Sequence, residues 1–105
     1  MNLVNSELPF IKYRRRKIKV TYKSLKDCYG MYDPNVHTLY IDQNLKDEKL
    51  FNTLIHELFH IIIYNDNIDV NNRGEEPVAD AVGNGFTRIF KQNPKLWDIL
   101  SDCLF

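Results

Sequence analysis

The chain has 105 residues, which is enough for one domain with a modest hydrophobic core and too little for a second catalytic module. Its 14 Lys and Arg residues balance its 14 Asp and Glu residues, so the net charge gives no indication of a nucleic-acid partner. No apolar run reaches the ~18 residues that a membrane-spanning helix needs, and no signal-peptide pattern is present. We therefore expect a single domain over residues 1–105, away from membranes and in the cytoplasm.

The amino-terminal part is predicted to contain an arm, a basic turn and a strand. Residues 1–10 have a mixed composition and are expected to form a flexible arm. The basic cluster Arg14–Lys17 has two interpretations: contact with nucleic acid or an acidic partner, or, more commonly, a solvated strand edge whose charges discourage strand pairing. Ile18, Val20 and Tyr22 then alternate with polar residues, and this period of two predicts a half-buried strand.

A β-hairpin is predicted next. Two apolar runs, residues 29–32 and 36–41, flank Asp33-Pro34-Asn35, and these are typical turn residues. His37 lies in the second run and is a minor candidate for a metal ligand, because a lone histidine on a strand is usually structural. Cys28 and Cys103 have no framework spacing, so we expect free thiols.

The motif His56-Glu57-x-x-His60 lies in the middle of the next predicted helix, at about residues 45–64. Residues i and i+4 share a helix face, so the two imidazoles point at a common position and can bind one Zn²⁺ at about 2.0–2.1 Å. Glu57 projects about 100° away from His56 and can take a proton from a metal-activated water without binding the metal. The alternative is a pair of structural histidines, but two of the chain's three histidines occupy this pattern.

The rest of this helix carries three further expectations. It is apolar nearly all round, as expected of a buried central helix. Asn44 or Asp47 is expected to cap its amino terminus. Tyr64 follows His60 by four residues, so it is a candidate hydrogen-bond donor to a developing oxyanion, although a tyrosine there more often only packs.

A second helix is predicted from Pro77 to about Lys91, after a polar loop. Glu76, just before it, is the main candidate for the third metal ligand, with Glu75 and Asp80 as alternatives. Asp80 is expected instead to accept an N–H from a ligand histidine and to fix its tautomer. Acidic residues at a helix start are also favoured without any metal, and a residue before proline avoids the helical region, which makes Glu76 a candidate helix cap.

Two further features concern packing near the carboxyl terminus. Gly83 and Gly85 cost helix stability, and a close approach to the first helix would explain them. The apolar residues after Pro94 predict a short closing helix on the core or, alternatively, a surface for a protein partner.

The two motifs together resemble the ImmA/IrrE-type zinc peptidases, whose pattern is His-Glu-x-x-His followed by Glu-x-x-Ala-Asn-x-Phe-Ala. The chain is also similar to thermolysin-type gluzincins, which have Glu-x-x-x-Asp, and to small phage-encoded proteins of the metallopeptidase type. The resemblance covers about residues 18–93, and this chain departs from it at Pro77, Asp80 and Gly83. It implies a minimal zincin-like α+β fold: a small antiparallel sheet or hairpin, the motif helix, a ligand-bearing helix and a short last helix. It also implies that Val36–Ile41 could be an edge strand that binds the substrate backbone; the alternative, equally favoured, is a core strand covered by the motif helix.

The expected activity is zinc-dependent hydrolysis of a peptide bond in a peptide or protein substrate. His56, His60 and Glu76 would hold Zn²⁺, and Glu57 would act as general base. Mn²⁺, Fe²⁺, Co²⁺ or Ni²⁺ can occupy similar ligands. One alternative is a catalytically silent, zinc-stabilised binding or assembly protein. A weaker alternative is a nucleic-acid-associated adaptor that uses Arg14–Lys17.

Overall fold

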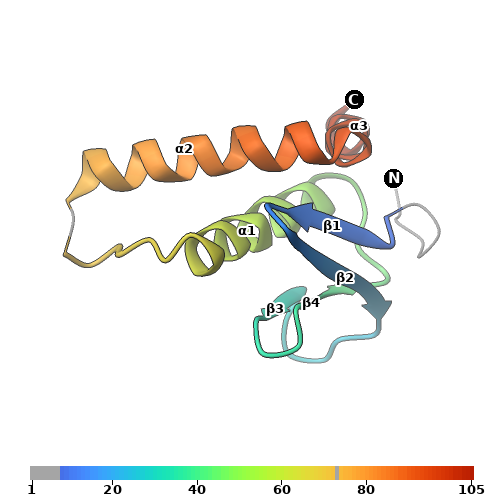
Figure 1. Cartoon of the computed structure of the whole chain (residues 1–105). Helices are drawn as coiled ribbons and strands as arrows, with labels where there is room; N and C mark the ends of the chain where they lie inside the picture. Colours follow the sequence, from blue (N-terminus) through green and yellow to red (C-terminus); the bar gives the residue numbers. More distant parts are fainter. Residues whose placement is uncertain (1–7, 73) are drawn as a thin grey trace.

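The computed structural model describes residues 8–72 and 74–105, which form an α+β fold of four strands and three helices (Figure 1). The expected arm falls mostly on residues outside this part. The strands are β1 (Phe10–Tyr13), β2 (Arg16–Lys23), β3 (Gly30–Asp33) and β4 (Thr38–Asp42). The helices are α1 (Asp47–Asn65), α2 (Glu75–Gln92) and α3 (Pro94–Leu104).

The predicted half-buried strand is confirmed as β2, in which Ile18 and Val20 are buried and the intervening lysines are exposed. The predicted hairpin is also confirmed: β3 and β4 are antiparallel, and the Asp33 carboxylate accepts the backbone N–H of Asn35 in the turn.

The sheet is mixed, whereas the sequence led us to expect an antiparallel one. Its strand order is β1-β2-β4-β3, and β2 and β4 are parallel. The chain leaves β2, forms β3 at the far edge and returns as β4 between them. The expectation that Val36–Ile41 is an edge strand is therefore wrong: β4 pairs on both sides, and β3 is the edge strand of that hairpin.

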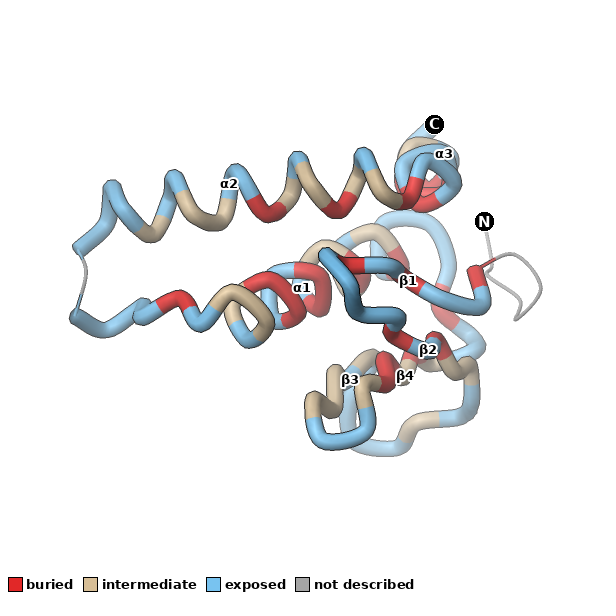
Figure 2. Tube along the Cα trace, in the orientation of Figure 1, coloured by how far each residue is buried: buried red, intermediate tan, exposed pale blue. Residues whose placement is uncertain are grey.

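Helix α1 lies between the sheet and α2, and the part of its surface that neither of them covers stays exposed (Figures 1 and 2). Its apolar stripe packs in the core and comprises Leu50, Leu54, Leu58, Ile61 and Ile62. The expectation of a helix buried all round is wrong, because Phe59 and Tyr64 are 39% and 50% exposed. The expected cap is also absent: Lys46 occupies the N-cap position, with no side-chain capping hydrogen bond.

Helix α2 approaches α1 at Gly85. A Cβ on Gly85 would collide with the Ile62 side chain and lie 2.9 Å from the hydroxyl oxygen of Tyr13. The close approach inferred from the sequence is thus confirmed for Gly85. It is wrong for Gly83, where an added Cβ would have no neighbour within 4 Å.

The end of α2 is joined to the free edge of β1 by two side-chain amides. Asn93 Oδ1 accepts the Lys12 N–H at 2.8 Å, and Asn93 Nδ2 donates to the Lys12 carbonyl at 2.7 Å. Gln92 repeats this exchange with the backbone of Arg14 at 2.7 and 2.9 Å. The amides therefore occupy hydrogen-bonding groups that an edge strand would otherwise present to solvent.

A group of polar side chains ties β1, α1 and α2 together. Asp66, which ends α1, accepts hydrogen bonds from the Tyr13 hydroxyl and from Arg14 Nε, both at 2.6 Å. Arg88 of α2 donates to the Tyr13 oxygen at 3.2 Å. Burial of Tyr13, together with its hydrogen bond to Asp66, raises the pKa of this phenol above its ordinary value.

The last helix closes the core as predicted. Leu96, Ile99, Leu100 and Cys103 are buried, whereas Trp97 is 56% exposed. Both cysteines are free, as expected, and burial raises the pKa of the Cys103 thiol. Within the described residues, none of the helices is both long enough and apolar enough to cross a bilayer.

Candidate metal centre

The two histidines of the motif lie one turn apart on the exposed side of α1. Their Nε2 atoms are 3.1 Å apart, and the rings meet edge to face with centroids 4.7 Å apart. Both side chains are exposed, because neither the sheet nor α2 covers this side of the helix. The i, i+4 spacing has therefore brought two imidazole nitrogens to one position, as the sequence predicted.

This pair fits a tetrahedral metal ion. Two nitrogens that each lie 2.0–2.1 Å from one tetrahedral Zn²⁺ are about 3.3–3.4 Å apart. The observed separation of 3.1 Å is close to this value. His56 and His60 are therefore already placed to share one metal without a change of backbone.

Glu57 lies beside the pair and is nearly inaccessible to solvent. It is 5% exposed, and its Oε2 is 3.9 Å from Nε2 of His56. Among the described residues no donor makes a hydrogen bond to this carboxylate. No described side-chain oxygen is both fully buried and without a hydrogen-bond partner, and Glu57 lines the pockets on both sides of it, so its carboxylate oxygens are open to water. The group is therefore available to accept a proton from a neighbouring water.

Gly30, the first residue of β3, is packed directly against Glu57. A Cβ at this position would be 2.8 Å from Thr53 Cγ2 and 3.3 Å from Glu57 Cγ. The absence of a side chain thus allows the edge strand to approach the helix at the predicted general base. A glycine inside a strand pattern is a known signal of close backbone approach, but the sequence analysis did not use it.

The predicted third ligand is not brought to the histidines. Glu76 and Asp80 are both exposed on α2, and Glu76 is a residue of the first helical turn rather than a cap. With about 100° per residue, both lie roughly 160° around α2 from the line through buried Gly85 and Ile89. They therefore face away from α1.

Glu75 lies nearer the side of α2 that faces α1. It lines a groove of about 640 Å³ together with Phe59, Val78 and Val82. The first turns of α2 extend past the end of α1 (Figure 1). Among the residues that the structure describes, no three His, Cys, Asp or Glu side chains gather as a metal-binding group.

A cleft of about 460 Å³ runs from the histidines along the edge strand β3. Its floor on the helix side includes Glu57, His60 and Tyr64, and its wall includes Met31 and Tyr32 of β3. The rings of Tyr32 and Tyr64 meet edge to face with centroids 6.2 Å apart. Tyr64 therefore lies in the cleft of the candidate centre, as its spacing from His60 predicted.

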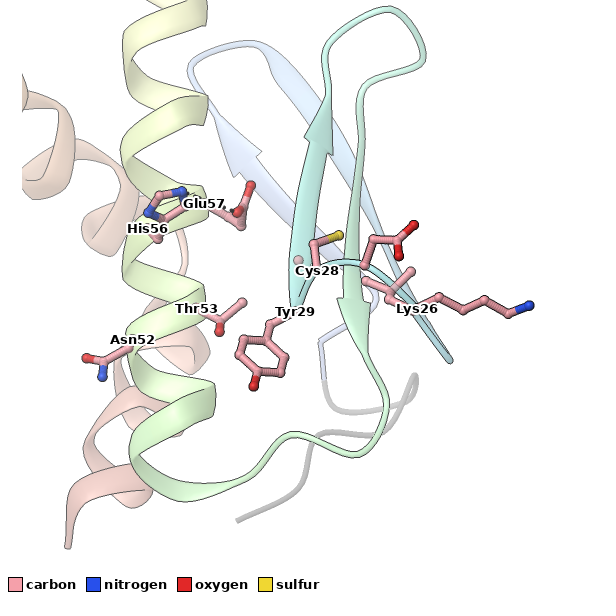
Figure 3. Close-up of a pocket in the computed structure, with 10 residues that line it drawn as sticks. Lys26, Cys28, Tyr29, Asn52, Thr53, His56 and Glu57 are labelled. Carbon is pink, nitrogen blue, oxygen red and sulfur yellow. Dashed lines mark ion pairs between the residues drawn. The ribbon is translucent and has the colours of Figure 1, made fainter.

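A second pocket, of about 650 Å³, lies on the other side of His56 and Glu57. The segment before β3 lines it, and Figure 3 shows Tyr29 of that segment between the strand and Thr53 of α1. The two pockets share Gly30, His56 and Glu57, so the candidate centre lies between them. The sequence analysis gave no role to Tyr29 or to exposed Cys28 in this pocket.

His37 lies apart from this groove. It follows the β3–β4 turn, with a positive φ of 47°, and its ring is hydrogen-bonded to the Arg16 guanidinium. Its pocket is formed by the basic β1–β2 turn.

Comparison with known proteins assigns no family. No protein-family model, no curated protein and no solved structure matches this chain.

Proposed function

We propose that this chain is a zinc-dependent metallopeptidase with a zincin-like fold. The observation that carries the proposal is the pair of Nε2 atoms 3.1 Å apart beside the buried, donor-free carboxylate of Glu57. Further support comes from the groove that runs from this site along the edge strand β3. Such a strand can bind an extended peptide through its free backbone groups.

His56 and His60 would hold the metal, and an acidic residue at the start of α2 would complete the set. Glu76 is the residue that the motif predicts, and Glu75 is the nearest competitor because it lies closer to the α1-facing side. When bound, the metal supplies a Lewis acid that polarises a carbonyl oxygen and lowers the pKa of water. A cytoplasmic location stays a prediction from the sequence.

Glu57 would carry out the proton transfers. Its carboxylate would take a proton from the attacking water and pass it to the leaving amine. Its near-complete burial holds the carboxylate in one place, and the missing donor leaves its oxygens free for this transfer.

The first test measures zinc content after dialysis, independently of activity. We expect one zinc per chain in the unsubstituted protein and in Glu57→Gln, and loss of zinc in His60→Ala. His37→Ala is the matched control, because this histidine lies in another pocket, and it should keep its zinc.

The third ligand is identified by comparing Glu76→Ala, Glu75→Ala and Asp80→Ala. The residue whose replacement gives the lowest zinc content is the ligand. Full zinc content in His56→Ala and His60→Ala would refute the site.

The second test measures casein hydrolysis with and without a chelator. Glu57→Gln should lower the rate by at least about 10²-fold, which is the usual contribution of a general base. Glu48→Gln, an exposed acid in the first turn of α1, should leave the rate unchanged. If the protein binds zinc but cleaves no substrate, it is the silent binding protein considered above.

A further inference from the structure

A basic pocket adjoins the candidate groove at the end distant from Tyr29. It has a volume of about 620 Å³ and is lined by the β1–β2 turn, by His37 and by Asn65. The basic residues of the turn are Arg14, Arg15, Arg16 and Lys17. No carboxylate lines this pocket, so its potential is positive.

Among the described residues, three of these four cations have no carboxylate partner. Arg14 is paired with Asp66 at 2.6 Å. Arg16 contacts the His37 ring, and the Lys17 ammonium lies 4.0 Å from the centroid of the Phe10 ring. Within the described residues, neither of these two nor Arg15 lies within ion-pair distance of an Asp or Glu. The charge of the turn is therefore available to an anionic ligand.

Asn65 connects the basic pocket to the groove. It lines the basic pocket, and its Nδ2 donates a hydrogen bond at 3.1 Å to the hydroxyl of Tyr32, which lines the groove. An extended peptide that passes the histidines and follows β3 therefore reaches the basic turn after crossing Tyr32.

The distance can be expressed in residues of substrate. Asn65 is about seven residues beyond the midpoint of His56 and His60, which is about 10 Å along a helix. At about 3.3 Å per residue, an extended peptide spans this distance in about three residues, and side-chain reach adds one more. β3 runs from Gly30, beside Glu57, toward Tyr32, beside Asn65. A peptide paired antiparallel to β3 runs in the opposite direction, from Tyr32 toward Gly30. Its residues before the cleaved bond therefore lie at the end of the groove that adjoins the basic pocket.

We propose that the substrate is an acidic peptide segment, with Asp or Glu three to four residues before the cleaved bond, held by Arg15, Arg16 and Lys17. This inference rests on the proposed peptidase function. A peptide fits better than nucleic acid, because the chain has zero net charge and the basic cluster Arg14–Lys17 lies in a single pocket beside the groove.

The test maps cleavage sites by mass spectrometry in a proteome-derived peptide library treated with the zinc-loaded protein. We expect Asp and Glu to be enriched at the third and fourth residues before the cut. The double variant Arg15→Gln/Arg16→Gln should lose this enrichment, and its kcat/KM on a fluorogenic Glu-Glu peptide should fall about fivefold or more. The control Lys91→Gln/Lys95→Gln makes the same charge change on α2 and α3 and should retain both. High salt should weaken the preference in the unsubstituted protein.

The outcomes separate this inference from the proposed function. If the zinc-loaded protein cuts no peptide, the peptidase function itself fails. If it cuts peptides without an acidic preference, only the present inference fails. Binding to a 20-nucleotide DNA strand and to the Glu-Glu peptide can be compared with the Glu57→Gln variant. If this variant binds the DNA more tightly, and if the added substitutions Arg15→Gln/Arg16→Gln abolish the DNA binding, the acidic-peptide inference is overturned in favour of a nucleic-acid site.

Discussion

Gly30 allows strand β3 to lie against helix α1 at the carboxylate of Glu57. An added Cβ would meet Thr53 and Glu57 of the helix and would also lie 3.3 Å from the Tyr40 carbonyl oxygen. Any side chain here would push the edge strand away from the groove or displace the carboxylate. The placement of the carboxylate that we propose as general base thus depends on a residue that has no functional group of its own.

Gly30→Ala should destabilise the protein by about 1–3 kcal/mol, because the new methyl group is forced into occupied space. Urea unfolding followed by circular dichroism would measure this. Gly83→Ala is the matched control: its Cβ meets nothing within 4 Å, and removing a helical glycine should stabilise by about 0.5–1 kcal/mol. Equal stability of the two variants would show that β3 does not press on Glu57.

At the residue scale, the positions of side chains on one helix were predictable from the sequence. Whether side chains from two different helices meet at one site was not. The imidazole pair follows from helical spacing alone, so the motif was sufficient to place His56 and His60 together. The third ligand depends on how α2 is rotated and where it crosses α1, and the Gly85–Ile62 contact decides both. That contact turns Glu76 away from the histidines. Whether metal binding brings it back is what the zinc measurements test.

Among the elements, α2 and β1 are joined through side chains rather than through a strand partner. The side chain of Asn93 makes three hydrogen bonds, two to the backbone of Lys12 and one to the Ile89 carbonyl at 2.7 Å. It is 9% exposed, so these bonds are largely shielded from water. The bond to Ile89 also helps to end α2, immediately before Pro94 begins α3.

Asn93→Ala should lower the free energy of unfolding by about 1–3 kcal/mol, because it leaves shielded backbone groups of Lys12 without partners. Gln92→Ala removes the equivalent exchange with Arg14 at an exposed position, where water can replace the amide, and should cost less than about 1 kcal/mol. Chemical denaturation of both variants under one set of conditions provides the comparison. A larger loss for Gln92→Ala would contradict this explanation.

The elements themselves were largely predictable, and their arrangement was less so. Alternating apolar residues identified β2, the Asp-Pro-Asn turn identified β3 and β4, and the apolar periodicity identified all three helices. Strand β1 was not predicted, because the residues up to Phe10 were expected to form an arm. The parallel pairing of β2 with β4 was not predictable, because it depends on which side of β2 the hairpin docks. Helix α2 begins at Glu75, two residues before the predicted start at Pro77.

For the whole molecule, the polar group around Asp66 links the sheet to two helices. Through Tyr13, it also makes the free energy of unfolding fall at alkaline pH. The pKa of Tyr13 is raised in the folded state, mainly by burial and then by the Asp66 carboxylate. The folded protein therefore holds this proton more tightly than the unfolded chain does. Its stabilising contribution is complete below the ordinary tyrosine pKa of about 10 and is lost as the pH rises through the raised value.

Tyr13→Phe should flatten the fall in stability above about pH 10, because the phenylalanine has no proton to release. At neutral pH it should cost about 1 kcal/mol, the typical net value of a hydrogen bond, for loss of the bond to Asp66. Thermal unfolding between pH 8 and pH 11 would measure both effects. The control Tyr29→Phe replaces an exposed tyrosine and should show the same dependence of stability on pH as the unsubstituted protein. Parallel curves for Tyr13→Phe and the unsubstituted protein would contradict the assignment.

The side-chain amides on β1 have a consequence for how the protein meets other chains. With Lys12 and Arg14 already engaged, β3 is the border of the sheet that remains open to strand addition. That border also lines the groove beside His60. Self-association through the sheet would therefore block access to the groove. For the peptidase proposed above, a stacked or fibrillar form should be inactive, and a bound peptide should protect the protein against aggregation.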